Sequence, residues 1–251
     1  MAIKRKVWLI SFLVILVSLA ILVFSWLILR KEKPIAINQN SNINQNLIDI
    51  YNNQKARLID GLFVSDDYND QVPLAVIIEN SVDGWPIAGI DRANLVYETI
   101  AEATITRFLA IYSLDEIIEK IGPVRSARPY FVDWAEEYGA ILAHVGGSTQ
   151  ALEKIKKNKA NDLNQYFQSQ YFWRAANRLA PHNVYTSSAY LKEARDKFNL
   201  AEPVYQSWQY KEDELLGKRP DQQELEINFS NALYQVKWSY DKEKNDYLRW
   251  Q

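Results

Sequence analysis

The chain contains no cysteine, only one methionine and two histidines, and eight residues each of glycine and proline. The lack of cysteine excludes disulfides, thiolate catalysis, cysteine-ligated metal sites and a lipid-modified N-terminal cysteine. A net charge of -2 and a pI of about 5.8 show no basic excess, so nucleic-acid binding is not expected. No metal site is predicted, and the composition does not indicate any particular cofactor.

The strongest local signal is an uncharged apolar run from Val7 to Leu29. A bilayer core of ~30 Å needs about 20 helical residues, so this run is long enough to span it. A cleaved signal peptide would have an apolar region of only ~7–15 residues and a small-residue cleavage site. Here bulky residues, Trp26 among them, lead directly into Arg30. We therefore predict an uncleaved transmembrane anchor at 7–29.

The orientation of this anchor follows less directly from charge. Three cations at positions 4–6 precede the run and three between positions 30 and 33 follow it, so the positive-inside rule is nearly balanced. The short N-terminal tail favours a cytoplasmic location for residues 1–6. The remaining chain is then predicted to lie outside the cytoplasmic membrane, joined to it through residues 7–29.

The composition changes after the anchor. Residues 30–56 are rich in Asn and Gln and cannot bury a core, so they are predicted to form a linker. Apolar β-branched runs at 74–78, 95–98, 107–112 and 140–145 predict strands, and helices are expected near 126–138, 149–157 and 188–198. Strands mixed with helices predict an α/β domain at 57–203, with a mixed and mostly buried sheet.

Beyond residue 203 the apolar residues alternate with polar ones, as at Leu225, Ile227 and Phe229. This period of two is typical of half-buried strands. A turn is expected at 241–245, between strands that end near Trp250. Because an isolated hairpin is marginal in water, residues 204–251 are interpreted as a small appendage or as part of a β-rich second domain.

Several uncommon motifs between residues 57 and 200 resemble the YerB-like bacterial lipoprotein family. They are Thr106–Tyr112, Gly122–Tyr130, His144–Ser148 and Ala180–Thr186, and the pairs Glu79-Asn80 and Tyr97-Glu98 also fit. The resemblance implies an envelope protein of unassigned activity on the outer face of the cytoplasmic membrane. It also implies a β-rich C-terminal domain, of which residues 236–249 resemble the start. The chain is therefore either a fragment or a shortened homologue, with a span in place of the acylated cysteine.

Three arginines are candidates for an anion site. Arg125 and Arg128 flank an expected helix start, where free backbone N–H groups favour anions, and Arg107 begins the expected strand at 107–112. Guanidinium groups match carboxylate and phosphate geometry. The alternative is internal pairing with the nearby acids Glu98, Glu102 and Asp133.

Two glutamates are candidates for proton transfer. Glu98 and Glu102 are four residues apart, so they are expected on one side whether the segment is a strand or a helix. Two nearby carboxylates can act as acid and base or hold a metal. Pairing with the arginines is the alternative.

The two histidines and a glycine pair lie at expected loop edges. His144 ends a strand directly before Gly146, Gly147 and Ser148, and His182 lies in a loop with Asn183. The order strand, glycines and helix can bind an anion through backbone amides. Ser148 beside His144 could act as a nucleophile, but helix capping explains it as well.

These residues predict one ligand site at an edge of the sheet. Its predicted members are Arg107, Arg125, Ser126, Arg128, His144, Gly146, Gly147, Ser148, His182 and Asn183. The leading function is a binding module for an anionic cell-wall or surface ligand, either a glycan or a peptide. The alternatives are a cell-wall-active hydrolase or transferase, with Glu98, Glu102, His144 or His182 as proton carriers, and a protein-interaction scaffold.

Overall fold

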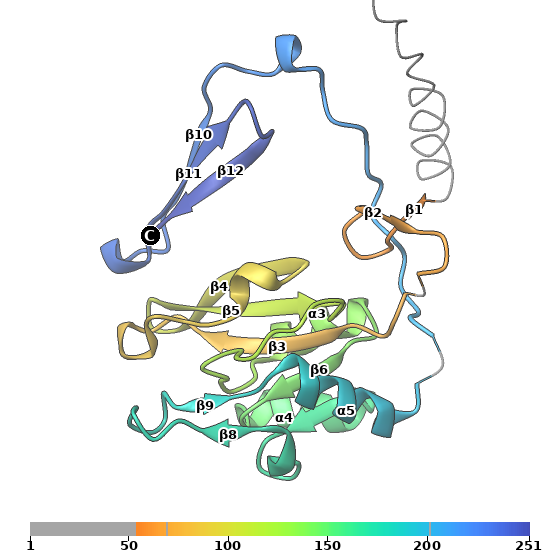
Figure 1. Cartoon of the computed structure of the whole chain (residues 1–251). Helices are drawn as coiled ribbons and strands as arrows, with labels where there is room; N and C mark the ends of the chain where they lie inside the picture. The colour runs from red at the N-terminus through yellow and green to blue at the C-terminus, as the bar shows by residue number, and fades with distance from the viewer. Residues whose placement is uncertain (1–53, 69, 201) are drawn as a thin grey trace, which may run out of the picture. The chain divides into compact units, whose positions relative to one another are not determined.

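The computed structural model describes residues 54–68, 70–200 and 202–251 (Figure 1). Every described residue belongs to one compact unit, Gln54–Gln251. The predicted tail at 1–6, the anchor at 7–29 and most of the linker at 30–56 lie outside the described residues. Within the described ranges, no helix is long and apolar enough to cross a bilayer.

Regular structure is already present in the last residues of the predicted linker. Strand β1 (Gln54–Ala56) pairs antiparallel with β2 (Phe63–Ser65). Arg57 follows β1 directly and forms ion pairs with Asp60 and Asp115. The structured part of the chain therefore extends at least to Gln54, three residues before the predicted boundary.

The main sheet has five strands in the order β4-β5-β3-β6-β7. Their bounds are β3 (Leu74–Glu79), β4 (Leu95–Glu102), β5 (Ile105–Tyr112), β6 (Ile141–His144) and β7 (Asp162–Asn164). The central strand β3 is antiparallel to β5 and parallel to β6, and β7 is parallel to β6. The predicted mixed α/β fold is confirmed, and all four predicted apolar runs form strands of this sheet.

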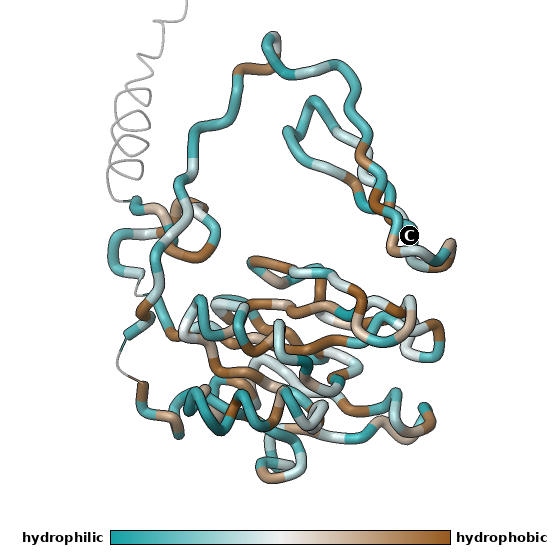
Figure 2. Tube along the Cα trace, turned by 180° about the vertical axis from the view of Figure 1, so that it is seen from behind, coloured by the Kyte–Doolittle hydropathy of each residue, from teal (hydrophilic) through white to brown (hydrophobic). Residues whose placement is uncertain are grey.

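Both faces of the sheet are buried around β3, in which all six residues are buried. Val76 and Ile78 belong to a core cluster that includes Leu191 of the last helix. Ala75 and Ile77 belong to the opposite cluster, with residues of the two preceding helices. The apolar residues are concentrated along these strands (Figure 2). This two-sided burial explains why the strand is a continuous apolar run rather than an alternating one.

Three α-helices cover the sheet, and each was predicted within a few residues. They are α3 (Pro129–Glu137), α4 (Thr149–Asn158) and α5 (Ser188–Phe198). Helix α3 begins at Pro129, three residues after the predicted start, because proline is favoured in the first turn and its fixed φ suits the first helical position. Ser148 and Ser187 cap α4 and α5 by accepting backbone N–H groups.

An extended segment, residues 121–128, connects otherwise distant parts of the domain. It forms four isolated bridges, Ile121↔Thr186, Gly122↔Ala88, Val124↔Ile78 and Ala127↔Gly147. The Arg125 amide also donates to the Ile77 carbonyl, and the Val145 amide donates to the Arg125 carbonyl. The segment therefore lies between the end of β3 and the loop that follows β6.

The remaining regular structure is in small sheets and turns. Strands β8 (Trp173–Arg174) and β9 (Val184–Tyr185) form a pair, and β10 (Glu224–Ile227), β11 (Val236–Asp241) and β12 (Asp246–Trp250) form an antiparallel sheet. The 3₁₀ turns are Val82–Gly84, Ile90–Arg92, Ser169–Tyr171, Leu216–Lys218 and Ala232–Tyr234. The predicted turn at 241–245 joins β11 to β12, as the alternating pattern indicated.

Candidate functional site

The three parallel strands of the sheet all end in a buried polar residue. Glu79 ends β3, His144 ends β6 and Asn164 ends β7, and none of them is more than 3% exposed. Buried polar groups are costly unless they are hydrogen-bonded. Each of the three side chains therefore holds the loops around it, and these loops carry most of the predicted site residues.

Glu79 connects three loops through one carboxylate oxygen. Its Oε1 accepts the Ser81 hydroxyl at 2.5 Å, lies 2.7 Å from His182 Nδ1 and lies 3.4 Å from Arg125 Nε. Its Oε2 is buried and has no hydrogen-bond partner among the described residues, and the same holds for Arg125 Nε. The cluster therefore retains unused hydrogen-bonding capacity next to two predicted site residues.

His182 is held by Glu79 on one side only. Its Nδ1 faces the buried carboxylate, while its Nε2 lies 3.9 Å from the exposed Asp83 carboxylate, beyond hydrogen-bond distance. A carboxylate that orients one imidazole nitrogen leaves the other available for proton transfer. Among the four predicted proton carriers, His182 is thus the one with an unoccupied nitrogen at the surface.

The other predicted pairing involves Glu102. Its Oε1 pairs with both Arg128 and Arg107, the latter at 3.0 Å. Arg107 also donates to the Ser126 carbonyl at 2.9 Å. Burial, followed by the nearby Arg125 guanidinium, lowers the pKa of Arg107 to about 10, an effect that the Glu79 carboxylate opposes. Arg107 stays charged at neutral pH, but its charge is already paired with Glu102 of the same domain.

Glu98 and Glu102 do not lie on the same face of the sheet, contrary to the prediction from their spacing. A β-bulge shifts the register of β4 between Ile100 and Glu102. Before the bulge Glu98 is opposite Phe108, whereas Glu102 is opposite Ile105. Cross-strand partners share a face and successive residues alternate, so the bulge turns Glu102 toward the opposite side. The prediction that both glutamates lie on one side was wrong, because one extra residue at the bulge interrupts the alternation of side chains between the two faces.

Glu98 belongs to a separate polar group on its own face. It accepts the Thr106 hydroxyl at 2.8 Å and the Asn80 amide at 3.3 Å, and it pairs with Arg249 at 2.8 Å. The Gln251 side chain exchanges hydrogen bonds with Asn80 at 3.2 and 3.3 Å. Glu98 therefore connects β4 to residues of the C-terminal sheet, which leaves it paired rather than free for proton transfer.

His144 is fully buried, and its ring is occupied on both sides. Its Nδ1 lies 2.6 Å from the Gly146 carbonyl, and its Nε2 lies 2.6 Å from Asp162 Oδ1. Ser148 accepts the Ala151 amide as the cap of α4 and makes no described contact with His144. The structure thus supports the capping role of Ser148 and gives His144 a structural role beneath the glycine loop.

The glycine loop needs its glycines for different reasons. Gly146 has a φ of +58°, and a Cβ there would come within 2.7 Å of the Tyr166 ring. At Gly147 a Cβ would lie 3.2 Å from Ala127, the bridging partner in the extended segment. The first glycine permits the turn and the approach of an aromatic ring, and the second permits close backbone pairing.

A cleft of about 680 Å³ lies beside this loop. Of the predicted site residues it is lined by Ser126, Gly146 and Gly147, and its other walls include Lys156, Lys159, Asp162, Asn164, Tyr166 and Phe167. The lining contains two lysines and one aspartate, so the cleft has an excess of positive charge. Its size lies within the range of small-ligand sites.

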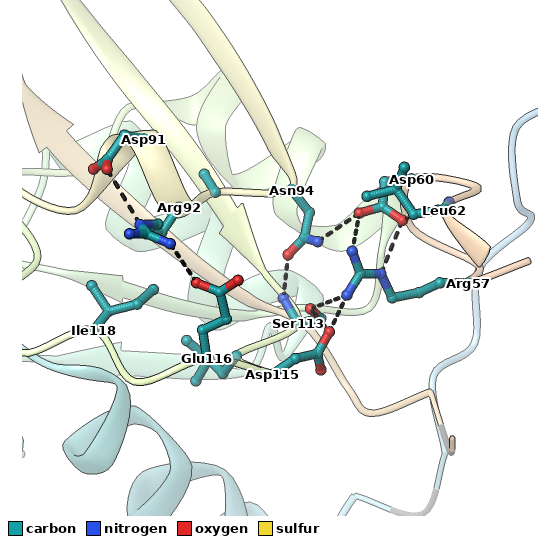
Figure 3. A pocket seen from close by; sticks show the side chains of 12 residues that line it. Arg57, Asp60, Leu62, Asp91, Arg92, Asn94, Ser113, Asp115, Glu116 and Ile118 are labelled. Atoms are coloured by element: carbon teal, nitrogen blue, oxygen red, sulfur yellow. Dashed lines mark hydrogen bonds and ion pairs between the residues drawn. The ribbon is translucent and has the colours of Figure 1, made fainter. Parts of the chain in front are cut away.

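A second cleft of about 440 Å³ lies on another part of the domain (Figure 3). Its charged side chains are paired with one another, since Arg57 lies between Asp60 and Asp115, and Arg92 pairs with Glu116 at 2.7 Å. The hydrogen bonding that Arg57 donates to the Asp60 carboxylate is the main cause of a raised pKa at Arg57. Among the described residues, no group of three histidine or acidic side chains is arranged to hold a metal.

The predicted site residues therefore divide into groups. Arg125 and His182 gather at Glu79, Arg107 and Arg128 gather at Glu102, and Asn183 accepts from Arg174 at 2.9 Å. Ser126, Gly146 and Gly147 line the larger cleft, with His144 beneath it. The sequence alone indicated no functional role for Glu79, Lys156, Lys159, Tyr166 or Phe167. The polar residue at the end of an apolar run was the available signal for Glu79.

The fold and this edge define the class of the protein, a mixed α/β domain whose parallel strands end in buried polar residues. The chain belongs to the family described as "Protein of unknown function (DUF3048) N-terminal domain", which matches residues 60–201. The resemblance found from the motifs is thereby confirmed.

A relative from Bacillus subtilis is similar both in sequence and in its solved structure. The protein named "Putative lipoprotein YerB" of strain 168 is 32% identical over 192 residues, which cover 75% of this chain and 58% of the relative. The crystal structure of the YerB protein matches with a TM-score of 0.66 and 30% identity, over 77% of this chain and 65% of the solved one. This chain thus spans about three fifths of the relative's length.

Replacing Glu79 tests whether its carboxylate holds the edge together. Glu79→Gln keeps the size of the side chain but removes the charge that faces Arg125 and His182. We expect a loss of about 1–3 kcal/mol in the free energy of unfolding, since buried donors lose a charged acceptor. Urea denaturation measures this loss. The exposed Asp83→Asn is the control and should change stability by less than about 0.5 kcal/mol. Equal effects of the two variants would contradict the role of Glu79.

Proposed function

We propose that the chain is a membrane-anchored extracytoplasmic module that binds an anionic cell-wall or surface ligand. The apolar run at 7–29 supports the anchor, because its length suits a bilayer span. The relative's name describes a lipoprotein, a class attached to membranes from outside the bilayer core. In this chain, which has no cysteine, the apolar run would replace the lipid as the means of attachment.

The cleft beside the glycine loop is the ligand site in this proposal. The observation that carries it is the excess of positive charge at this cleft, whose lining contains Lys156 and Lys159 but only one acidic residue, Asp162. Lys156 and Lys159 form no ion pair with any described residue, in contrast to Lys154, which pairs with Asp133 at 2.5 Å. The predicted arginines serve a supporting role, because Glu79 and Glu102 already neutralise them.

The anchor is tested by fractionation of cells that produce the full chain. We expect the protein to stay in the membrane pellet after alkaline carbonate washing, because a spanning helix is held by its buried apolar surface. Protease added outside intact protoplasts should digest the folded domain. Release by carbonate, or protection of the domain from external protease, would contradict the proposed topology.

The cleft is tested by removing the charges of Lys156 and Lys159. Lys156→Gln with Lys159→Gln should weaken co-sedimentation of the full chain with purified cell walls by about two- to tenfold at low salt. The effect should shrink as salt is added, since surface charges are screened. Lys157→Gln is the matched control, because Lys157 is exposed on the same helix but does not line the cleft. Equal binding by the double variant and the control would contradict the cleft as an anion site.

A further inference from the structure

Two aromatic side chains stand exposed at the mouth of the larger cleft. Tyr166 is 66% exposed and Phe167 is 80% exposed, in the loop that follows β7. Exposed apolar rings that border a cavity often mark an interaction surface, whereas isolated exposed residues need no explanation. These two are adjacent in the chain and both line the same cleft.

The loop that carries these rings is held in place by hydrogen bonds. Asn164 is 3% exposed, and its Oδ1 accepts the backbone amides of Gly146 and Tyr166, both at 3.2 Å. Its carbonyl accepts the amides of Phe167 and Gln168 at 2.9 Å. The Gln168 side chain accepts the Asn164 backbone amide and donates to the Asp162 carbonyl. The rings are therefore displayed on a fixed support, which reduces the entropy cost of binding.

The surroundings of the rings are polar and carry both signs of charge. The Asp162 carboxylate lines the cleft and is oriented from below by His144 at 2.6 Å. Lys156 on α4 and Lys159, which directly follows α4, also line the cleft. Flat apolar faces, an oriented hydrogen-bond acceptor and cations together match a sugar ring that bears hydroxyl and acidic groups.

We propose that the cleft binds an anionic glycan, with sugar rings stacked on Phe167 and Tyr166 and acidic groups beside Lys156 and Lys159. This inference rests on the proposed function and names the ligand class for the same site. Asp162 accepts sugar hydroxyls in this arrangement. An acidic polypeptide would use the lysines but would not require the exposed rings.

The test titrates the full chain in detergent with three soluble probes. They are an oligosaccharide of alternating glucuronate and N-acetylglucosamine, a neutral N-acetylglucosamine oligomer, and an oligoglutamate of matched charge. We expect the acidic oligosaccharide to bind most tightly. Phe167→Ala should weaken its binding about three- to tenfold and leave oligoglutamate binding unchanged, because only the sugar stacks on the ring.

The control variant is Leu179→Ala, which removes an equally exposed apolar side chain from another loop and should change nothing. An unchanged affinity of Phe167→Ala for the acidic oligosaccharide, or oligoglutamate binding as tight as the oligosaccharide, would overturn the glycan inference alone. If Lys156→Gln with Lys159→Gln leaves the binding of both acidic probes unchanged, the proposed anion-binding function fails instead.

Discussion

The organisation of this domain depends on the need to satisfy polar groups that are buried at the ends of three parallel strands. Glu79, His144 and Asn164 each end a strand in the core. An unpaired polar group there would cost several times the net value of an ordinary hydrogen bond. The segments around the strand ends supply most of the partners and become fixed in return, although Glu79 Oε2 has no partner among the described residues.

The extended segment at 121–128 converts these separate contacts into one edge. It pairs with β3 through Val124 and with the glycine loop through Ala127, so residues far apart in the sequence share one backbone network. The motifs that identify the family at 106–112, 122–130, 144–148 and 180–186 all contact this segment or its neighbours. Their joint presence in the sequence is explained by this pairing as well as by any ligand.

The sequence predicted most of the α/β domain because its elements carry strong local signals. Continuous apolar runs mark strands buried on both faces, and Pro129, Ser148 and Ser187 mark helix starts. The bulge between Ile100 and Glu102 has no comparable signal in the sequence. It alone places Glu98 and Glu102 on opposite faces of the sheet. A single inserted residue reverses the face of every residue after it, so face assignments along β4 needed the structure.

The candidate site was predicted in part, for a physical reason. Glycines and arginines stand out in a sequence, and Gly146 and Gly147 do line the cleft. Lysines on a helix and aromatic residues in a loop do not stand out, because their role depends on which side of the helix or loop they occupy. The position of Phe167 at the cleft depends on the hydrogen bonds of Asn164, which connect residues that share no sequence pattern.

The central claim is that the ligand site lies at this edge of the sheet. Hydrogen exchange with mass detection, on the full chain with and without the acidic oligosaccharide, locates the site directly. We expect slower hydrogen exchange in peptides that cover 145–148, 156–160 and 164–168, since ligand contact would suppress local opening there. Protection confined to the second cleft around Arg57 and Asp115, or to strands β10–β12, would contradict it.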